Sequence, residues 1–179
     1  EVYLLRHHVY GGNAFNVYNT SNITFSNIKL YAIAGMGWLI ENRTERFRLI
    51  NCVIGLDPER DDNRVSATAD GVHIANTNGK FKISGCDFSF MGDDDVNVHD
   101  NVAKVTNRLN DKAVEIYTNA NNFAAGDTAI FSSKGFDDLN FSATVMSVDG
   151  SKLTFDKELP DYIAKDCIVS NGSIDSGNY

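Results

Sequence analysis

The chain has little positive charge, only two prolines and no long hydrophobic run. Its 179 residues include 16 lysines and arginines against 24 aspartates and glutamates, which gives a net charge of −8. Because a nucleic-acid-binding protein needs a basic surface, we expect no nucleic-acid partner. A membrane-spanning helix needs about 18 apolar residues in a row, so we also expect no membrane span. Hydrophobic residues still make up 42% of the chain, which is enough to build a core.

Cysteine is scarce as well. The three cysteines, Cys52, Cys86 and Cys167, cannot all pair with one another, and none belongs to a Cys-x-x-Cys motif of the kind that binds zinc. We therefore expect buried free thiols that act as small hydrophobic side chains.

Asparagine, in contrast, is abundant, with 20 of the 179 residues, and part of this excess follows an internal repeat. Four segments, which begin at Phe15, Trp38, Val72 and Val96, read apolar-x-apolar-x-Asn, with Asp in place of Asn in the last. They start 23, 34 and 24 residues apart, and two more short alternating segments follow each of the first three. Three short strands in each repeat are typical of a parallel β-helix, so the sequence predicts an all-β fold of this class.

The repeat stops after Asn101. The residues that follow alternate as ordinary antiparallel strands, and Asp149-Gly150 is typical of a two-residue hairpin turn. We expect a small antiparallel β-barrel inserted into the β-helix, with a C-terminal module as the alternative. Since the chain begins with Glu1 rather than methionine, we interpret it as a piece of a longer protein. The predicted domains are the β-helix over residues 1–102, the barrel over residues 103–169 and a truncated return toward the β-helix over residues 170–179.

Acidic residues gather at one point of the repeat. Asp70 and Asp94 each precede an equivalent strand position by two residues, so we expect them on adjacent levels, about 4.8 Å apart. Asp93 and Asp95 flank the second of them. Because like charges repel, such crowding favours a protonated carboxyl group, which a general acid needs. Two carboxyl groups about 5–10 Å apart are the catalytic pair of glycosidases, and a solvated acidic turn or a Ca²⁺ site stays open as an alternative.

Other polar side chains are predicted to lie beside the acidic cluster. His73, Asn97 and His99 alternate with inward-facing apolar residues, so they face outward on neighbouring strands. They are candidates for binding sugar, with plain surface residues as the alternative. Arg64, in a long polar loop, and His8, ahead of the first repeat, complete the set of candidate substrate-binding residues.

Several motifs resemble those of glycoside hydrolase family 110. Members of this family are bacterial exo-α-1,3-galactosidases that invert the anomeric configuration and need no metal. Their fold is a right-handed parallel β-helix with a small inserted β-barrel. The matching motifs are residues 8–16, 23–31 and 35–37, the run Ser66-Ala67-Thr68-Ala69-Asp70-Gly71-Val72-His73, Gly92-Asp93-Asp94 and Asn97-Val98-His99.

The resemblance implies a specific activity, the removal of terminal α-1,3-linked galactose from oligosaccharides or glycans. It also implies that Asp70 is the general acid, that Asp93 and Asp94 activate water, and that no metal or other cofactor takes part. The family usually has a small apolar residue where this chain has Asp95, so we expect Asp95 to be a supporting charge. A secreted, periplasmic or cell-surface location in a bacterium is implied as well.

Two other functions stay open. Polygalacturonases of glycoside hydrolase family 28 carry a similar pattern, matched here by Thr68-Ala69-Asp70 and Gly92-Asp93-Asp94. Their polyanionic substrate needs positive charge, of which residues 55–101 have little. The other alternative is a non-catalytic β-helix module that binds carbohydrate. The sequence leaves open the exact oligosaccharide, the oligomeric state and the activity of the isolated chain.

Overall fold

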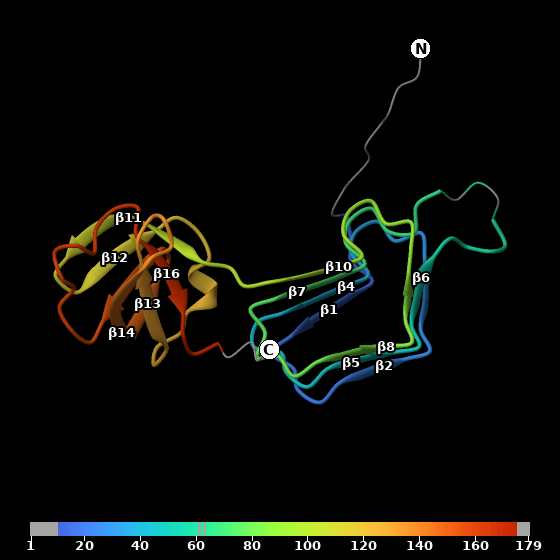
Figure 1. Cartoon of the computed structure of the whole chain (residues 1–179), viewed down its shortest axis with the longest axis horizontal. Helices are drawn as coiled ribbons and strands as arrows, with labels where there is room; N and C mark the ends of the chain where they lie inside the picture. Colours follow the sequence, from blue (N-terminus) through green and yellow to red (C-terminus); the bar gives the residue numbers. More distant parts are fainter. Residues whose placement is uncertain (1–10, 61, 63, 175–179) are drawn as a thin grey trace, which may run out of the picture. The chain divides into compact units, whose positions relative to one another are not determined.

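The computed structural model describes residues 11–60, 62 and 64–174. The chain divides into two compact units, one ending at Asp100 and the other beginning at Asn101 (Figure 1). Apart from the 3-10 turn Ala120–Asn122, the regular structure of the described residues is β-strand. Within this part of the chain, no helix is long and apolar enough to cross a membrane.

The first unit consists of three parallel sheets, and each of the first three repeats contributes one strand to each sheet (Figure 1). In the largest sheet, Phe15 pairs with Trp38, Trp38 with Val72 and Val72 with Val96. The register that the repeat predicts for this sheet is therefore confirmed. By sheet, the strands are β1 (Phe15–Tyr18), β4 (Trp38–Glu41), β7 (Val72–Ala75) and β10 (Val96–His99); β2 (Thr24–Ser26), β5 (Arg48–Ile50) and β8 (Lys82–Ser84); β3 (Lys29–Tyr31), β6 (Val53–Gly55) and β9 (Asp87–Phe88).

The predicted fold class, a right-handed parallel β-helix with a small inserted antiparallel β-barrel, is wrong. The described residues form three parallel sheets of four, three and three strands and, in the second unit, a closed barrel of six antiparallel strands. After β10 the chain enters antiparallel pairing at β11 (Ala103–Asn110), so the described part of the chain shows no solenoid. A two-residue apolar period determines which face of a strand is buried, but not how many strands stack or how the sheets join. The all-β class and the antiparallel barrel are retained, whereas the parallel β-helix is not.

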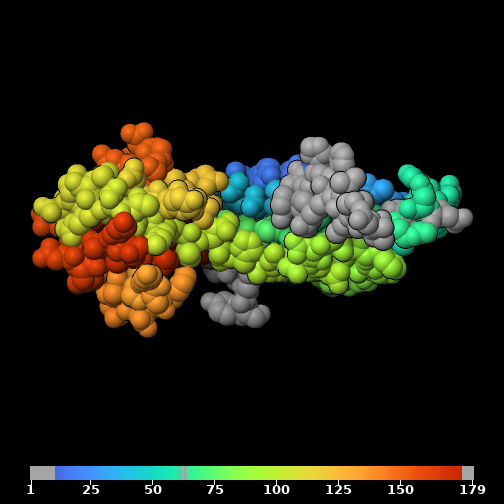
Figure 2. Space-filling view, turned by 90° about the horizontal axis from the view of Figure 1, so that it is seen from above, coloured from blue at the N-terminus to red at the C-terminus, as the bar shows by residue number. Residues whose placement is uncertain are grey.

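Alternate residues of the parallel strands build the core of the first unit. Trp38 and Ile40 are fully buried, and the indole ring of Trp38 stacks on Phe15 with centroids 5.5 Å apart. On β10, the last strand in the order of this sheet, Val96 and Val98 are 39% and 42% exposed. Figure 2 shows this yellow-green part of the chain at the surface. Each inward side chain is thus covered by its equivalent on the next strand, and among the described residues β10 has no such strand beyond it.

Asparagine marks the bends between strands. Asn19, Asn42 and Asn76 follow β1, β4 and β7 directly, with φ angles of 47°, 55° and 52°. This left-handed conformation strains most side chains, whereas asparagine tolerates it comparatively well. Asparagine accounts for eight of the fifteen non-glycine residues that the structure describes with positive φ. The backbone geometry of the bends therefore explains much of the asparagine excess.

The second unit is a closed barrel with the strand order β11-β12-β15-β14-β13-β16 (Figure 1). Asp149 and Lys152 pair across the β14–β15 hairpin, and Gly150 has a φ of 56° in its turn, which confirms the predicted hairpin. The rings of Phe131 and Phe155 pack in the core with centroids 5.4 Å apart. The remaining strands are β12 (Ala113–Ile116), β13 (Thr128–Ser132), β14 (Asp138–Asp149), β15 (Lys152–Phe155) and β16 (Ile168–Asn171).

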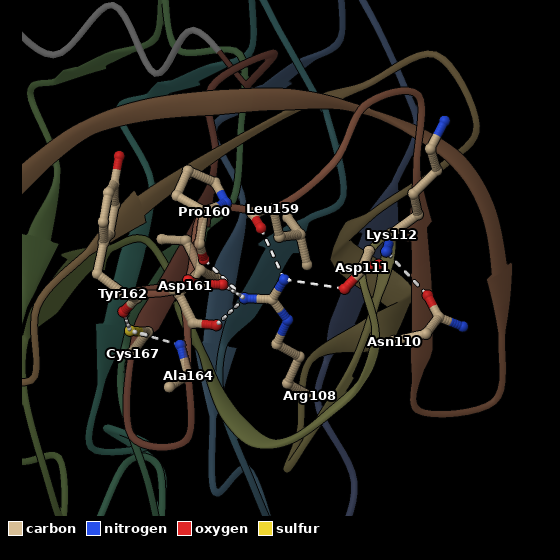
Figure 3. A network of polar contacts seen from close by, with 11 residues as sticks. Arg108, Asn110, Asp111, Lys112, Leu159, Pro160, Asp161, Tyr162, Ala164 and Cys167 are labelled. Atoms are coloured by element: carbon tan, nitrogen blue, oxygen red, sulfur yellow. Dashed lines mark hydrogen bonds and ion pairs between the residues drawn. The ribbon is translucent and has the colours of Figure 1, made fainter.

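An arginine holds the irregular segment that follows β15. The guanidinium of Arg108, on β11, donates hydrogen bonds to the carbonyl oxygens of Leu159 and Pro160, both at 2.7 Å (Figure 3). A longer bond of 3.4 Å reaches the carbonyl oxygen of Ile163, whose side chain is fully buried. Since this segment forms no strand, its carbonyl groups need other donors, and Arg108 supplies several of them, while the Ile163 N–H also donates to the carbonyl oxygen of Pro160.

Candidate active site

Stacked turns before β4, β7 and β10 position the acidic residues. The strand register places Met36, Asp70 and Asp94 at equivalent points of the three turns. The Gly37 N–H donates to the carbonyl oxygen of Asp70 at 3.1 Å, and the Gly71 N–H donates to that of Asp94 at 2.8 Å. Asp70 and Asp94 therefore lie on adjacent levels of the first unit, as the sequence repeat predicts.

Glycine is needed for this close stacking. A β-carbon at Gly71 would lie 2.7 Å from the carbonyl oxygen of Asp95, and one at Gly92 would lie 2.7 Å from that of Thr68. Both distances are well inside a normal non-bonded contact of roughly 3.5 Å. The glycines next to Asp70 and Asp93 thus have a steric role, because they let the two turns approach each other.

Three carboxyl groups meet at these turns. One carboxylate oxygen each of Asp70, Asp93 and Asp94 lies within 4.8 Å of the others. Asp70 is only 3% exposed, whereas Asp93 and Asp94 are exposed to solvent. The structure thus brings together the three predicted catalytic residues, one buried and two open to water. Such a group could also hold a cation, but three carboxylates alone do not indicate one, and we treat them as acid and base groups.

Asp70 is part of a chain of hydrogen bonds. His73 Nδ1 lies 2.6 Å from Asp70 Oδ2, and the Asn97 side-chain amide donates to the same oxygen at 3.4 Å. His73 Nε2 lies 3.0 Å from Nε2 of His99. Three of the predicted sugar-binding residues therefore gather beside Asp70, and both ring nitrogens of His73 have a partner. Their contacts with sugar stay predictions.

The other candidates are less closely tied to this cluster. Arg64 is exposed in the segment between β6 and β7, and its predicted contact with sugar stays a prediction. Asp95 is exposed as well, and its carbonyl oxygen accepts the Val72 N–H at 3.1 Å. His8 lies outside the described residues.

The contact between the two imidazole rings is not apparent from the sequence pattern. The pattern places His73 and His99 on one face of neighbouring strands, where each looks like a separate ligand for sugar. The three-residue spacing from Asp70 to His73, in a turn that leads into a strand, is the one local signal for a carboxylate–imidazole pair. The second contact depends on side-chain rotamers on two different strands.

Comparison with known proteins points to one kind of enzyme. The chain is similar to two curated proteins named α-1,3-galactosidase A, both from Bacteroides fragilis. The one from strain YCH46 is 26% identical over 160 residues, which cover 82% of this chain and 26% of the relative. The one from strain ATCC 25285 is 25% identical over 158 residues, which cover 80% and 25%. The resemblance to an α-1,3-galactosidase is confirmed. No family model matches the chain, and the chain spans about a quarter of the length of these two relatives.

Proposed function

We propose that the full-length protein hydrolyses terminal α-1,3-linked galactose from oligosaccharides with inversion of configuration. The observation that carries this proposal is the carboxyl cluster, in which one oxygen each of Asp70, Asp93 and Asp94 lies within 4.8 Å of the others. The similarity to proteins named α-1,3-galactosidase A supports the choice of sugar. The proposal concerns the full-length protein because the chain covers about a quarter of those relatives.

Asp70 is the general acid in this proposal. Its carboxyl group is buried, and His73 and Asn97 both bind its Oδ2, so the group points in a fixed direction. The proton of Asp70 passes to the glycosidic oxygen as the bond from that oxygen to the anomeric carbon breaks. The leaving sugar then departs as a neutral alcohol.

Asp93 and Asp94 hold and deprotonate the attacking water. A water that donates hydrogen bonds of about 2.8 Å to two oxygens holds them roughly 4.4 Å apart. Carboxylates within 4.8 Å of each other can therefore share one water. Because both residues are exposed, water can reach them. One of the two takes a proton as the water oxygen bonds to the anomeric carbon.

The separation of acid and base bears on the stereochemistry. Inverting pairs are usually about 6.5–9.5 Å apart and retaining pairs about 5–5.5 Å apart, whereas oxygens of Asp70, Asp93 and Asp94 lie within 4.8 Å here. The 4.8 Å limit applies to one oxygen of each carboxyl group, and the exposed side chains of Asp93 and Asp94 can turn outward when the sugar enters. The resemblance to the family supports inversion, and the anomer of the product tests it.

Substitution of each carboxyl group in the full-length protein tests the proposed roles. Asp70→Asn should lower kcat about 10²–10⁴-fold on an unactivated α-galactoside. The loss should shrink with a nitrophenyl leaving group, which departs without protonation. Asp93→Asn and Asp94→Asn should show no such recovery, because the water still needs a base. Asp95→Asn is the matched control, since it removes an exposed neighbouring carboxyl group and should keep most of the activity.

Proton NMR of the first-formed product should show β-galactose. Release of the α-anomer would overturn inversion, and unchanged activity of Asp70→Asn would overturn the assignment of the acid. Cleavage of polygalacturonate, or binding of galactosides without hydrolysis, would favour one of the two alternative functions. Loss of activity on treatment with EDTA would show that the carboxyl cluster holds a metal.

We also propose that the protein acts outside the cytoplasm of a bacterium. Glycans that end in galactose are too large and polar to cross a membrane unaided, so the enzyme has to meet them outside. Cell fractionation should recover galactosidase activity in the medium, in the periplasm or on the cell surface. Activity confined to the cytoplasm would contradict this location.

A further inference from the structure

The two histidines beside Asp70 form one continuous chain of hydrogen bonds. His73 Nδ1 lies 2.6 Å from Asp70 Oδ2, and His73 Nε2 lies 3.0 Å from Nε2 of His99. The two rings are nearly perpendicular, with an interplanar angle of 87° and centroids 4.9 Å apart. Asp70 is 3% exposed, while His99 is exposed. The chain therefore runs from the protein surface to a buried carboxyl group.

Each of the two contacts holds one proton, because a hydrogen bond needs one donor and one acceptor. With both rings neutral, two arrangements satisfy the chain. In the first, His73 donates from Nδ1 to Asp70 and accepts at Nε2 from His99. In the second, Asp70 donates to His73 Nδ1, and His73 donates from Nε2 to His99. The Asn97 amide favours the first, since it donates to Asp70 Oδ2 at 3.4 Å and so marks this oxygen as an acceptor.

We propose that His99 and His73 are positioning residues that orient Asp70 as a general acid with its proton on one defined oxygen, Oδ1. The Nε2–H of His99 donates to His73 Nε2, which keeps the proton of His73 on Nδ1. His73 and Asn97 then both donate to Oδ2 of Asp70, so that the acidic proton is carried by Oδ1. Among the described residues, the side-chain hydrogen bonds of Asp70 all go to Oδ2, which leaves Oδ1 for the glycosidic oxygen. This inference rests on the function proposed above.

The charged group in contact with His73 is Asp70, with Asp93 and Asp94 beside it, whereas its two neighbours in the sheet are uncharged. His73 lies in register with Leu39 of β4 on one side and with Asn97 of β10 on the other, and neither side chain carries a charge. An additional proton would make His73 a cation in contact with Asp70. A cation in contact favours the ionised form of a carboxyl group over the protonated form that a general acid needs. The proposal therefore requires the imidazole pair to be neutral during catalysis.

The tautomer of His73 can be measured directly in the 179-residue chain. Long-range nitrogen–proton correlation NMR distinguishes a protonated Nδ1 from a protonated Nε2. At a pH where both rings are neutral, we expect the proton of His73 on Nδ1 and that of His99 on Nε2. In His99→Phe, which keeps a ring but has no donor, His73 should become a mixture of tautomers. A proton on Nε2 of His73 in the unsubstituted chain would overturn the proposal.

Amide variants separate the roles of the two ring nitrogens. Asparagine in place of His73 puts an N–H near the position of Nδ1, whereas glutamine puts it near Nε2. In the full-length protein, His73→Asn should therefore retain more of kcat than His73→Gln. His73→Phe should be lowest, about 10- to 100-fold below the unsubstituted enzyme, as is usual when a residue that orients an active group is lost. At His99 the order should reverse, because glutamine restores the Nε2–H donor.

The leaving-group dependence separates this inference from the proposed function. The loss of kcat in the histidine variants should be greatest with poor leaving groups, as it should be in Asp70→Asn. Suppose that Asp70→Asn shows this dependence, but the asparagine and glutamine variants rank in the same order of kcat at His73 and at His99. The positioning role is then wrong and the proposed function stands. If Asp70→Asn keeps full activity, the assignment of Asp70 as the acid fails and this inference fails with it, whereas absence of α-galactoside hydrolysis by the unsubstituted full-length protein would overturn the proposed function itself.

Discussion

Gly71→Ala probes how the fold holds the acidic turns together. Gly71 directly follows Asp70, and its N–H donates to the carbonyl oxygen of Asp94 at 2.8 Å. An alanine β-carbon at this position would lie 2.7 Å from the carbonyl oxygen of Asp95. Since an ordinary contact needs about 3.5 Å, the two turns have to move apart by roughly 0.8 Å. The substitution therefore separates the two levels that carry the carboxyl groups.

The cost of this change has three parts. Forcing an extra methyl group into a packed site usually costs about 1–3 kcal/mol. Weakening the hydrogen bond from Gly71 to Asp94 adds about 1 kcal/mol. Alanine also restricts the unfolded chain, which offsets about 0.4–1 kcal/mol. We therefore expect the free energy of unfolding of the first unit to fall by about 1–3.6 kcal/mol.

Gly55→Ala is the matched control. Gly55 is buried in the same unit, and a β-carbon there would meet its nearest neighbour, Val53 Cγ1, at 3.6 Å, an ordinary contact. Neither Gly55 nor Gly71 has a positive φ, so backbone strain does not enter the comparison. The remaining effect is that alanine lowers the conformational entropy of the unfolded chain. Gly55→Ala should therefore be neutral or stabilising by up to about 1 kcal/mol.

The single tryptophan makes the assay specific for the first unit. Trp38 is fully buried in the core of that unit, so its fluorescence during urea unfolding reports on the parallel sheets. In the full-length protein, displacement of Asp70 by Gly71→Ala should also lower kcat, by up to about 10²-fold for a shift near 1 Å. Equal unfolding free energies for Gly71→Ala and Gly55→Ala would refute the steric argument.

Other expected outcomes concern the core, the barrel and the response to pH. Leu49→Ala removes a fully buried side chain and should destabilise the first unit by about 2–5 kcal/mol in the same fluorescence assay; a loss below about 1 kcal/mol would contradict the packing described. Arg108→Met removes a charged donor from two carbonyl oxygens at 2.7 Å. Because this side chain is only 21% exposed, we expect the free energy of unfolding of the barrel to fall by about 2–4 kcal/mol. Hydrogen exchange of the barrel amides should be faster in Arg108→Met. Arg60→Met, which removes an exposed ion pair, should change these exchange rates little. The hydrogen bond from the Lys104 ammonium holds the pKa of Asp166 below its usual range, so NMR titration should show this pKa rising in Lys104→Met. The stabilisation from this pair should be present at neutral pH and disappear as the pH falls through the lowered pKa of Asp166.

The sequence was sufficient to predict the order and register of the largest parallel sheet. Apolar alternation within a strand and asparagine at each bend are local features, and each is contained in about five residues. Repeating them aligns Val72 with Val96, and this alignment places Asp70 next to Asp94 on the adjacent level. The Asp149-Gly150 turn is local in the same sense, because two residues determine its backbone conformation.

Features that depend on packing between distant residues could not be predicted in this way. The β-helix prediction failed because local alternation does not determine how many strands stack or how the sheets join. The separation of the carboxyl groups and the contact from His73 to His99 depend on rotamers that neighbouring strands select together. Arg108 binds the carbonyl oxygen of Leu159, 51 residues further along the chain, and no local pattern indicates that partner. Local geometry therefore determined which residues occupy equivalent positions on neighbouring strands, whereas their distances and partners follow from the packing of the folded chain.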